Sequence, residues 1–454
     1  MAIHNLPEIH GYESFEKGST RTLLCIMFNL RYCICSAAVT IAIACPLRVM
    51  AQAPGVTLPA AEQRLLARNR DILAARRAVE TSQANTTTAA ARPNPTLSFG
   101  MSSINPSVGI GSGPLRDKTV DSSVRVDQVL ERGNRRDLRI SLAKSLETAS
   151  TEDLAEITRQ QIVALRMAFY DLLLFQEKTA VTRDAADLFQ RSVEAAEKRL
   201  NLGDIAASDV SRIRVDALRA ASDARAAEAD RRRAQVALAV LIGAEAEIAT
   251  LRAADGWPGL LEGGPLQIDP EKLDTRPDVR AAHKRVEAAL KARDLARSLR
   301  TRDVSVGAQY DRYPSNATNT FGTGNTYGVF VSIPLFVNYA YEGEIQRAEV
   351  DYTMAEEALE RSRALARSDA DRALADLQSE QERLRRSVLT LAEAGRAAQA
   401  AEFAYANGAL GVMDMLDARR TLRALQVEAA QSRADHAKAF AAWNAASGEF
   451  SGTP

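Results

Sequence analysis

Apolar and polar residues alternate along two neighbouring stretches in the first half of the chain. In residues 96–103, Leu97, Phe99 and Met101 fall on one face, and polar or small residues fall on the other. In residues 119–130, valines on one face likewise alternate with Asp, Ser and Arg on the other. A period of two is typical of a β-strand, and the stretch between is rich in Gly, Pro and Ser. The pattern predicts two strands joined by a loop.

Helical periodicity surrounds this pair of strands. Residues 60–90 predict an amphipathic helix, which the sequence Arg-Pro-Asn-Pro at 92–95 stops. Residues 134–202 contain neither Gly nor Pro, so a helix of roughly 100 Å is possible before Gly203. A second helix is predicted from about residue 208 to residue 242. A straight helix as long as the first does not fit inside a compact domain of ordinary size.

The second half of the chain repeats the first at a constant offset. A helix at 276–300, two alternating stretches and another long helix from about residue 344 follow in the same order. The offset is 205 positions at three landmarks, which pair Val124 with Val329, Gly203 with Gly408 and Asp209 with Asp414. Each repeat therefore consists of helix, strand, strand, very long helix, turn and helix. The predicted boundaries are 52–255 for the first repeat, 256–275 for a linker, 276–447 for the second repeat and 448–454 for a tail.

The lengths of the strands limit the architecture. Strands of about 9 to 11 residues with one apolar face are long enough to cross a bilayer within a β-barrel. Four strands cannot close a barrel, and an open edge in hydrocarbon leaves costly unpaired backbone groups. Other copies of the chain must therefore complete it, and either two or three copies would do so. The predicted fold class is mainly α with a small β part: a long α-helical tunnel plus a transmembrane β-barrel shared between chains.

The N-terminal region has the features of an export segment. All four cysteines lie in it, at positions 25, 33, 35 and 45, so the rest of the chain has no thiol chemistry. An apolar run at 33–44 is followed by Val-Met-Ala at 49–51, which predicts a signal peptide at 1–51. The run is too short for a transmembrane helix. Met27 is an alternative start, and Cys45 is a weaker candidate for lipidation.

Charge and motifs exclude several classes of function. The chain has 58 basic and 58 acidic residues, so it has no basic surplus with which to bind nucleic acid. It contains no Gly-rich phosphate loop, no HExxH zinc motif and no G-x-S-x-G motif, so neither an enzyme nor a cofactor site is predicted. After residue 51 only two histidines remain, His283 and His436, far apart and without cysteine. No dedicated metal site is therefore predicted.

The two turns carry a family resemblance. Residues Arg199 to Gly203 with Asp209, and Tyr405 to Gly408 with Asp414 to Ala418, stand in register with the strands and the long helices. Together with Val331 to Phe336 they resemble the outer-membrane efflux channels of the TolC family, over essentially the whole mature chain. The resemblance implies a homotrimer in outer-membrane lipid, with one shared barrel and a helical tunnel through the periplasm. It also implies a passive exit duct that works with a periplasmic adaptor (a membrane fusion protein) and an inner-membrane pump of the resistance, nodulation and division (RND) class.

The resemblance further implies functional residues at the periplasmic tip. Asp414 and Asp417 match a ring of aspartates that constricts the tunnel, and their spacing places both on one helix face. Asp209 and Tyr405 match positions that latch neighbouring helices, although Leu410 stands where a basic residue is implied. Helix capping is the alternative for the aspartates, because acidic residues are favoured near a helix N-terminus. At both turns a glycine is expected to end the long helix under either interpretation, namely Gly203 and Gly408.

Two segments indicate a branch of the family. Residues 309–314 and 341–349 are similar to the cobalt-zinc-cadmium resistance branch, so heavy-metal cations are the expected cargo. A duct for drugs or other small molecules is the alternative within the family. The alternative from another class is a periplasmic helical adaptor or coiled-coil structural protein, which would show sustained heptads and would not need strand pairs.

Overall fold

The computed structural model describes residues 55–104, 106, 113, 120–260, 267–314 and 324–448 of the chain. The expected signal peptide, the alternative start at Met27 and the lipidation candidate Cys45 lie outside these residues. The described residues all belong to one unit, residues 51–454. Among them, no helix combines the length and the apolar character that crossing a membrane requires.

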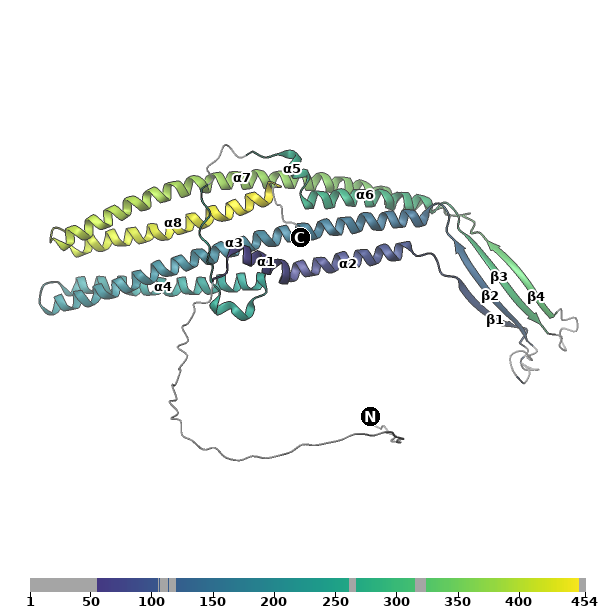
Figure 1. Ribbon diagram of the computed structural model, residues 1–454, viewed down its shortest axis with the longest axis horizontal. Coiled ribbons are helices and arrows are strands. Elements are labelled where there is room, and N and C mark those ends of the chain that lie inside the picture. Colours follow the sequence, from purple (N-terminus) through teal and green to yellow (C-terminus); the bar gives the residue numbers. More distant parts are fainter. Residues whose placement is uncertain are drawn as a thin grey trace, which may run out of the picture. The chain divides into compact units, whose positions relative to one another are not determined.

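A helix hairpin built on one very long helix forms most of the first half. Helices α1 (Leu58–Arg68) and α2 (Arg70–Ala90) precede the strands, and α3 (Arg135–Asn201) and α4 (Ala207–Ile242) follow them. Helices α1, α2 and α4 all pack on α3. Figure 1 shows α2 and α4 beside different stretches of α3. The very long helix and the arrangement of shorter helices along it are as the sequence predicts.

The second half has the same plan. Helix α6 (Pro277–Ser298) precedes its strands, and α7 (Glu342–Ala406) and α8 (Val412–Ala446) follow them. Both α6 and α8 pack on α7. Two short elements were not predicted, the 3₁₀ helix η2 (Glu245–Thr250) and α5 (Pro270–Asp274). The side chain of Asp269 caps α5 by accepting a hydrogen bond from the N–H of Glu271 (3.0 Å).

The prediction of one helix at 60–90 is wrong, because the helix is broken at Asn69. The Asn69 side-chain oxygen accepts hydrogen bonds from the N–H groups of Asp71 (3.0 Å) and Ile72 (3.1 Å) and so caps α2. Its side-chain nitrogen donates to the carbonyl of Leu241 on α4 (3.1 Å) and to Gln161 on α3 (3.3 Å). The break depends on partners far away in the sequence, which an amphipathic pattern does not reveal.

The strands form one antiparallel sheet in the order β1-β2-β3-β4. Their bounds are β1 (Thr96–Ser102), β2 (Asp121–Leu130), β3 (Val304–Tyr313) and β4 (Gly324–Ser332). Both predicted strand pairs are present, and β2 pairs with β3 across the two halves of the chain. Figure 1 shows the sheet beyond the ends of α3 and α7 that lie opposite the two helix turns. Strands β1 and β4 are the edges, and each has one unpaired side within the chain.

Small and medium apolar side chains join the helices. Helices α1, α3 and α4 bury a cluster that includes Phe169 and Leu238, and Ala437 brings α8 against it. Nearer the turns, Leu416 of α8 packs into a second cluster with Phe189 of α3. Alanine at such contacts allows helix axes to approach closely, because interaxial distance depends on side-chain size. Through these two clusters, helix α3 contacts helices of both repeats.

One buried histidine should make the free energy of unfolding depend on pH. His436 on α8 is 1% exposed, and neither ring nitrogen has a hydrogen-bond partner among the described residues. Burial lowers the pKa of His436 from its ordinary value of 6.5, because the charged form loses its water. Below that pH the unfolded chain therefore binds a proton that the folded chain does not. The free energy of unfolding should then fall by up to about 1.4 kcal/mol per pH unit.

Thermal unfolding of the full chain, followed from about pH 7.5 down to about pH 5.5, measures this effect. The melting temperature of the His436→Leu variant should fall less over this pH range than that of the wild type. The matched control is His283→Leu, at an exposed position on α6, which should decline like the wild type. An unchanged slope in His436→Leu would assign the pH dependence to other groups.

Candidate functional site

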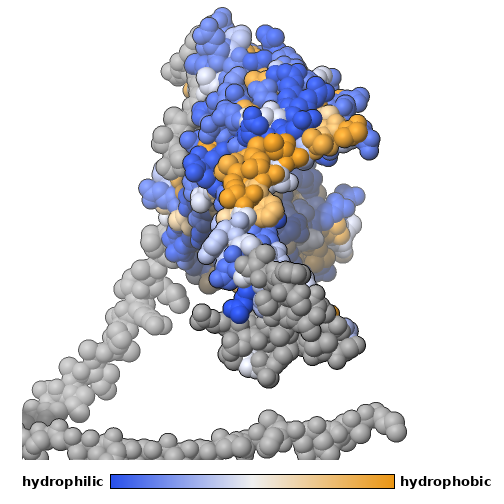
Figure 2. Space-filling view, turned by 90° about the vertical axis from the view of Figure 1, so that its right-hand side faces the viewer, coloured by the Kyte–Doolittle hydropathy of each residue, from blue (hydrophilic) through white to orange (hydrophobic). Residues whose placement is uncertain are grey.

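The sheet has one apolar face, which we call the apolar sheet face. Residues that pair directly across the strands point to the same side, and one such row is Leu97, Val126, Ala308 and Val329. The rows beside it contribute Phe99, Val124, Tyr310 and Tyr327, and Val306 with Val331. Phe99 is 75% exposed and Val329 is 79% exposed, so the rest of the described chain leaves this face uncovered. Figure 2 looks onto this end and shows hydrophobic residues gathered in a band.

The opposite face of the sheet is polar. Arg125 donates two hydrogen bonds to Asp127 (2.7 and 2.8 Å), and its guanidinium lies 4.5 Å from the centre of the Phe330 ring. Gln309 donates to Asp311 (2.6 Å) on the same face. A sheet that is apolar on one side and polar on the other has the chemistry of a barrel wall between hydrocarbon and water. One chain supplies a section of such a wall, with both edges open.

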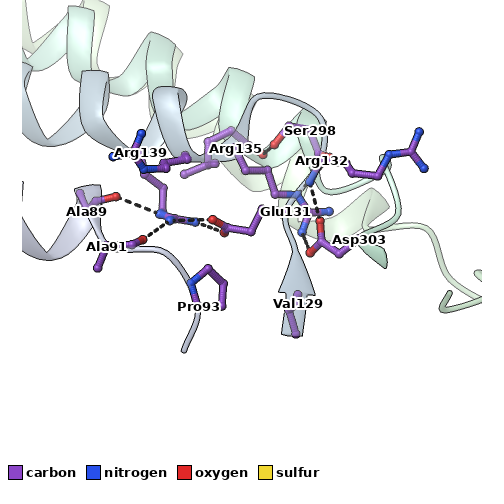
Figure 3. Close-up of polar contacts among 12 residues, drawn as sticks. Ala89, Ala91, Pro93, Val129, Glu131, Arg132, Arg135, Arg139, Ser298 and Asp303 are labelled. Atoms are coloured by element: carbon purple, nitrogen blue, oxygen red, sulfur yellow. Dashed lines mark hydrogen bonds and ion pairs between the residues drawn. The ribbon is translucent and has the colours of Figure 1, made fainter. Parts of the chain in front are cut away.

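An arginine at the start of α3 ties the sheet to the helices. Arg135 donates to Asp303, which precedes β3, at 2.6 Å. It also donates to the carbonyls of Leu299 (3.0 Å) and Thr301 (2.5 Å), just beyond α6. Carbonyls at a helix C-terminus lack helical partners and carry a partial negative charge, so a cation is favourable there. Figure 3 shows the Arg135 side chain between Ser298, at the end of α6, and Asp303, which precedes β3.

A second arginine makes the same kind of contact with α2. Arg139 donates to the carbonyl of Ala91 (3.1 Å) and forms an ion pair with Glu131, which follows β2 (Figure 3). The hydrogen bonds from Arg139 lower the pKa of Glu131, so this carboxylate stays charged in the folded chain. Arg136 between them donates to the carbonyl of Ala90 (2.8 Å). The start of α3 thus holds the ends of both shorter helices where the strands begin.

The two hairpin turns at the other end have the same backbone geometry. Gly203 (φ +82°) and Gly408 (φ +73°) are left-handed, a conformation that glycine adopts without steric cost. After each glycine the next residue donates to a carbonyl five positions back, from Asp204 to Arg199 and from Ala409 to Ala404, both at 2.9 Å. These glycines lie where α3 and α7 end.

Asp414 and Asp417 lie near the start of α8 and have different surroundings. The N-cap of α8 is Gly411, and the exposed Asp414 carboxylate has neither a hydrogen bond nor an ion pair among the described residues. Asp414 therefore makes no hydrogen-bonded cap in the described structure, but its place in the first turn of α8 still favours a negative charge there. The Asp417 carboxylate pairs with Arg420 (3.2 Å), and Arg420 also pairs with Asp216 of α4 (2.7 Å).

The two expected latch residues do not form a contact of their own in one chain. Asp209 and Tyr405 are both half-buried near the turns, and no hydrogen bond or ion pair joins their side chains in the described structure. The ion pair that joins the repeats at this level is that of Arg420 with Asp216, whose side chain is 16% exposed. The described residues also contain no group of three or more His, Cys, Asp or Glu placed to hold a metal ion.

Sequence reasoning missed the ion pairs near the turns, although two of them left a signal. Within each hairpin an arginine pairs with a glutamate on the long helix, Arg214 with Glu197 (2.6 Å) and Arg419 with Glu402 (2.5 Å). These two pairs are related by the same 205-residue offset as the strands and turns. Arg420 has no such signal, because its partner belongs to the other repeat.

Long helix hairpins that continue into a two-faced sheet are the architecture of an outer-membrane export channel. The sequence pattern of the outer membrane efflux protein family matches residues 62–244 and 270–449. The chain belongs to this family, whose members are transport ducts of the outer membrane. This confirms the resemblance seen in the sequence and places the helical part in the periplasm. A helical adaptor without strand pairs is not compatible with the sheet.

Individual relatives agree with this assignment. The cobalt-zinc-cadmium resistance protein CzcC of Cupriavidus metallidurans is 26% identical over 319 residues, which cover 68% of this chain and 72% of that protein. The solved structure of the outer-membrane channel OprN has a TM-score of 0.71 at 21% identity, over 86% of this chain and 89% of that chain. The outer membrane protein VceC of Vibrio cholerae has a TM-score of 0.68 at 18% identity, over 86% and 96%. The structural likenesses confirm the predicted fold class of a helical tunnel with a β-barrel, and the sharing of the barrel between chains stays a prediction.

Proposed function

We propose that three copies of this chain form the passive exit duct of a tripartite efflux system. The observation that carries the proposal is the sheet, whose apolar face is exposed and whose edges are open in a single chain. Such a sheet is stable in hydrocarbon only when other copies pair with both edges. Membership of the outer membrane efflux family supports the same arrangement. The duct guides cargo and catalyses no reaction.

The energy for export comes from partners in this proposal. An inner-membrane RND pump loads the duct through a periplasmic adaptor that meets the turns after α3 and α7. Asp414 and Asp417 constrict the tip, and Asp209 and Tyr405, together with the pair of Arg420 and Asp216, hold it closed. The tip opens when the hairpin of α7 and α8 moves outward about its turn.

The division of the chain belongs to the same proposal. Residues 1–51 act as the signal peptide, with Met27 as the alternative start and Cys45 as the alternative lipid attachment site. The first repeat occupies 52–255 and the second 276–447, with a linker at 256–275 and a tail at 448–454.

Heavy-metal cations are the proposed cargo. CzcC, which is 26% identical, is named for resistance to cobalt, zinc and cadmium. An exposed carboxylate at a constriction, such as that of Asp414, raises the local concentration of cations. Drugs or other small molecules are the rival cargo.

Export from cells tests the proposal. In the host strain, deletion of this chain should raise cell-associated cobalt, zinc and cadmium several-fold after a metal challenge, and the wild-type chain supplied in trans should restore the low level. A fluorescent dye measured in parallel reports drug-like cargo. Dye accumulation without metal accumulation would shift the cargo to small molecules, and no change in either would contradict the duct.

A further inference from the structure

Exposed arginines stand at three of the four places where the chain passes between the helices and the sheet. Arg92 lies between α2 and β1, Arg132 between β2 and α3, and Arg300 and Arg302 between α6 and β3. The register puts these places at the same end of the sheet, the end next to the helices, since Leu130 pairs with Val304 and Thr96 with Asp127. We call these four residues the arginine collar.

The side chains of the collar arginines form no ion pair with a carboxylate in the described structure, although the backbone N–H of Arg132 donates to Asp303 (3.0 Å). The acidic groups at this level, Asp303 and Glu131, are paired with Arg135 and Arg139. Figure 3 shows the Arg132 side chain pointing away from those pairs. The collar therefore presents positive charge that no ion pair within the described residues neutralises.

Two further carboxylates lie at this level, and the charge of one of them, Glu342, offsets part of the charge of Arg300 at longer range. Asp137 is exposed on the first turn of α3, and Glu342 opens α7 and accepts a hydrogen bond from the N–H of Ala340 (2.9 Å). Neither forms an ion pair with a collar arginine in the described structure. Arg302 instead lies over the Phe336 ring, 5.4 Å from its centre.

The collar adjoins exposed apolar side chains that continue the apolar sheet face. After β4 the chain exposes four such residues in alternation before α7 begins, Ile333, Leu335, Val337 and Tyr339. Aromatic residues beside arginine, next to an apolar membrane-facing wall, are typical of the bilayer interface. The exposed apolar residues and the unpaired arginines thus meet at one level of the molecule.

We propose that the arginine collar binds the phosphate groups of anionic phospholipids in the periplasmic leaflet of the outer membrane. The inference rests on the proposed duct, in which the apolar sheet face is embedded in that membrane. Guanidinium groups bind phosphate through paired hydrogen bonds, and each basic residue near an anionic surface strengthens the attraction. In the trimer the collar would repeat three times and fix the depth of the barrel in the bilayer.

Lipid binding to the full chain in neutral-detergent micelles tests the collar. The probe is a fluorescent phosphatidylglycerol, with phosphatidylcholine as the uncharged reference. Each arginine lost should weaken phosphatidylglycerol binding by roughly fivefold. The combined variant Arg92→Gln, Arg132→Gln, Arg300→Gln and Arg302→Gln should therefore need at least about tenfold more lipid for half-saturation, a conservative bound. The same four positions changed to Lys keep the charge and should retain most of the binding.

The matched control removes four exposed arginines of α4 and α7 that also lack ion pairs among the described residues, by Arg212→Gln, Arg361→Gln, Arg367→Gln and Arg385→Gln. This control should bind phosphatidylglycerol like the wild type. Lipid binding by the collar would be contradicted if the wild type and the collar Gln variant bound phosphatidylglycerol equally. It would also be contradicted if the wild type bound the two lipids equally.

Bilayer conductance of the same preparations separates this inference from the duct. If the preparations conduct and the collar Gln variant binds phosphatidylglycerol like the wild type, lipid binding by the collar is contradicted and the duct is not. Silent preparations in which the collar variant still loses phosphatidylglycerol binding would support the collar and contradict the duct.

Discussion

Replacing Asp414 and Asp417 by asparagine is expected to reduce the cation preference of the channel by roughly tenfold, because a ring of like charges at a constriction concentrates counter-ions to about that extent or more. In the proposed trimer the two changes remove every carboxylate of the ring. Asp414 should account for most of the effect, since Arg420 already offsets the charge of Asp417 at 3.2 Å. Reversal potentials in planar bilayers under a salt gradient measure the preference.

The control for this prediction removes the same charge from the other hairpin. Asp204 follows the turn after α3 and Glu194 lies on α3, both exposed, so Asp204→Asn with Glu194→Gln should leave the preference unchanged. An unaltered reversal potential in the Asp414 and Asp417 variant would show that these aspartates only stabilise the start of α8 and do not set ion selectivity. An equal loss in both variants would show that general tip charge, and not a ring, sets the preference.

Arg420→Ala is expected to raise the mean conductance several-fold by opening the tip more often. Arg420 makes the ion pair between α8 and α4 near the turns, and its loss leaves the mostly buried Asp216 carboxylate without a partner. The Arg420 side chain is 50% exposed, so solvent screens the pair and its contribution is about 1 kcal/mol. That energy changes the ratio of open to closed tips about fivefold.

Two variants check the interpretation of Arg420. Asp216→Ala should raise the conductance similarly, and combining the two changes should add little, because both remove one interaction. Arg214→Ala breaks an ion pair of the same type inside the first hairpin (2.6 Å), so it should leave the conductance unchanged. A rise with Arg214→Ala as large as with Arg420→Ala would show that general loosening of the helices opens the tip.

Local chemistry determined most of the elements, and for that reason the sequence predicted them. The absence of Gly and Pro over 134–202 allowed α3, and the period of two on either side of the first loop revealed β1 and β2. The constant offset between the halves then predicted α7, α8 and the second strand pair. Apart from the offset between the halves, each of these signals lies within the segment it describes.

The features that escaped prediction depend on partners distant in the sequence. Asn69 interrupts an amphipathic helix because Leu241 and Gln161 accept hydrogen bonds from its side chain. The contact of Arg420 with Asp216 joins residues 204 positions apart, and neither residue stands out in composition or periodicity. The latch role of Asp209 and Tyr405 came from a resemblance alone, and a single chain does not test a contact that a neighbouring copy would complete.

The number of chains in the solubilised complex tests the central claim most directly. The full chain, extracted in a neutral detergent and weighed by native mass spectrometry, should appear as a complex of three copies. Pairing of the open edges of β1 and β4 requires more than one copy. Membership of the outer membrane efflux family favours three copies over two. A folded protein that remains a single chain, or one that stops at two copies, would contradict the shared trimeric duct.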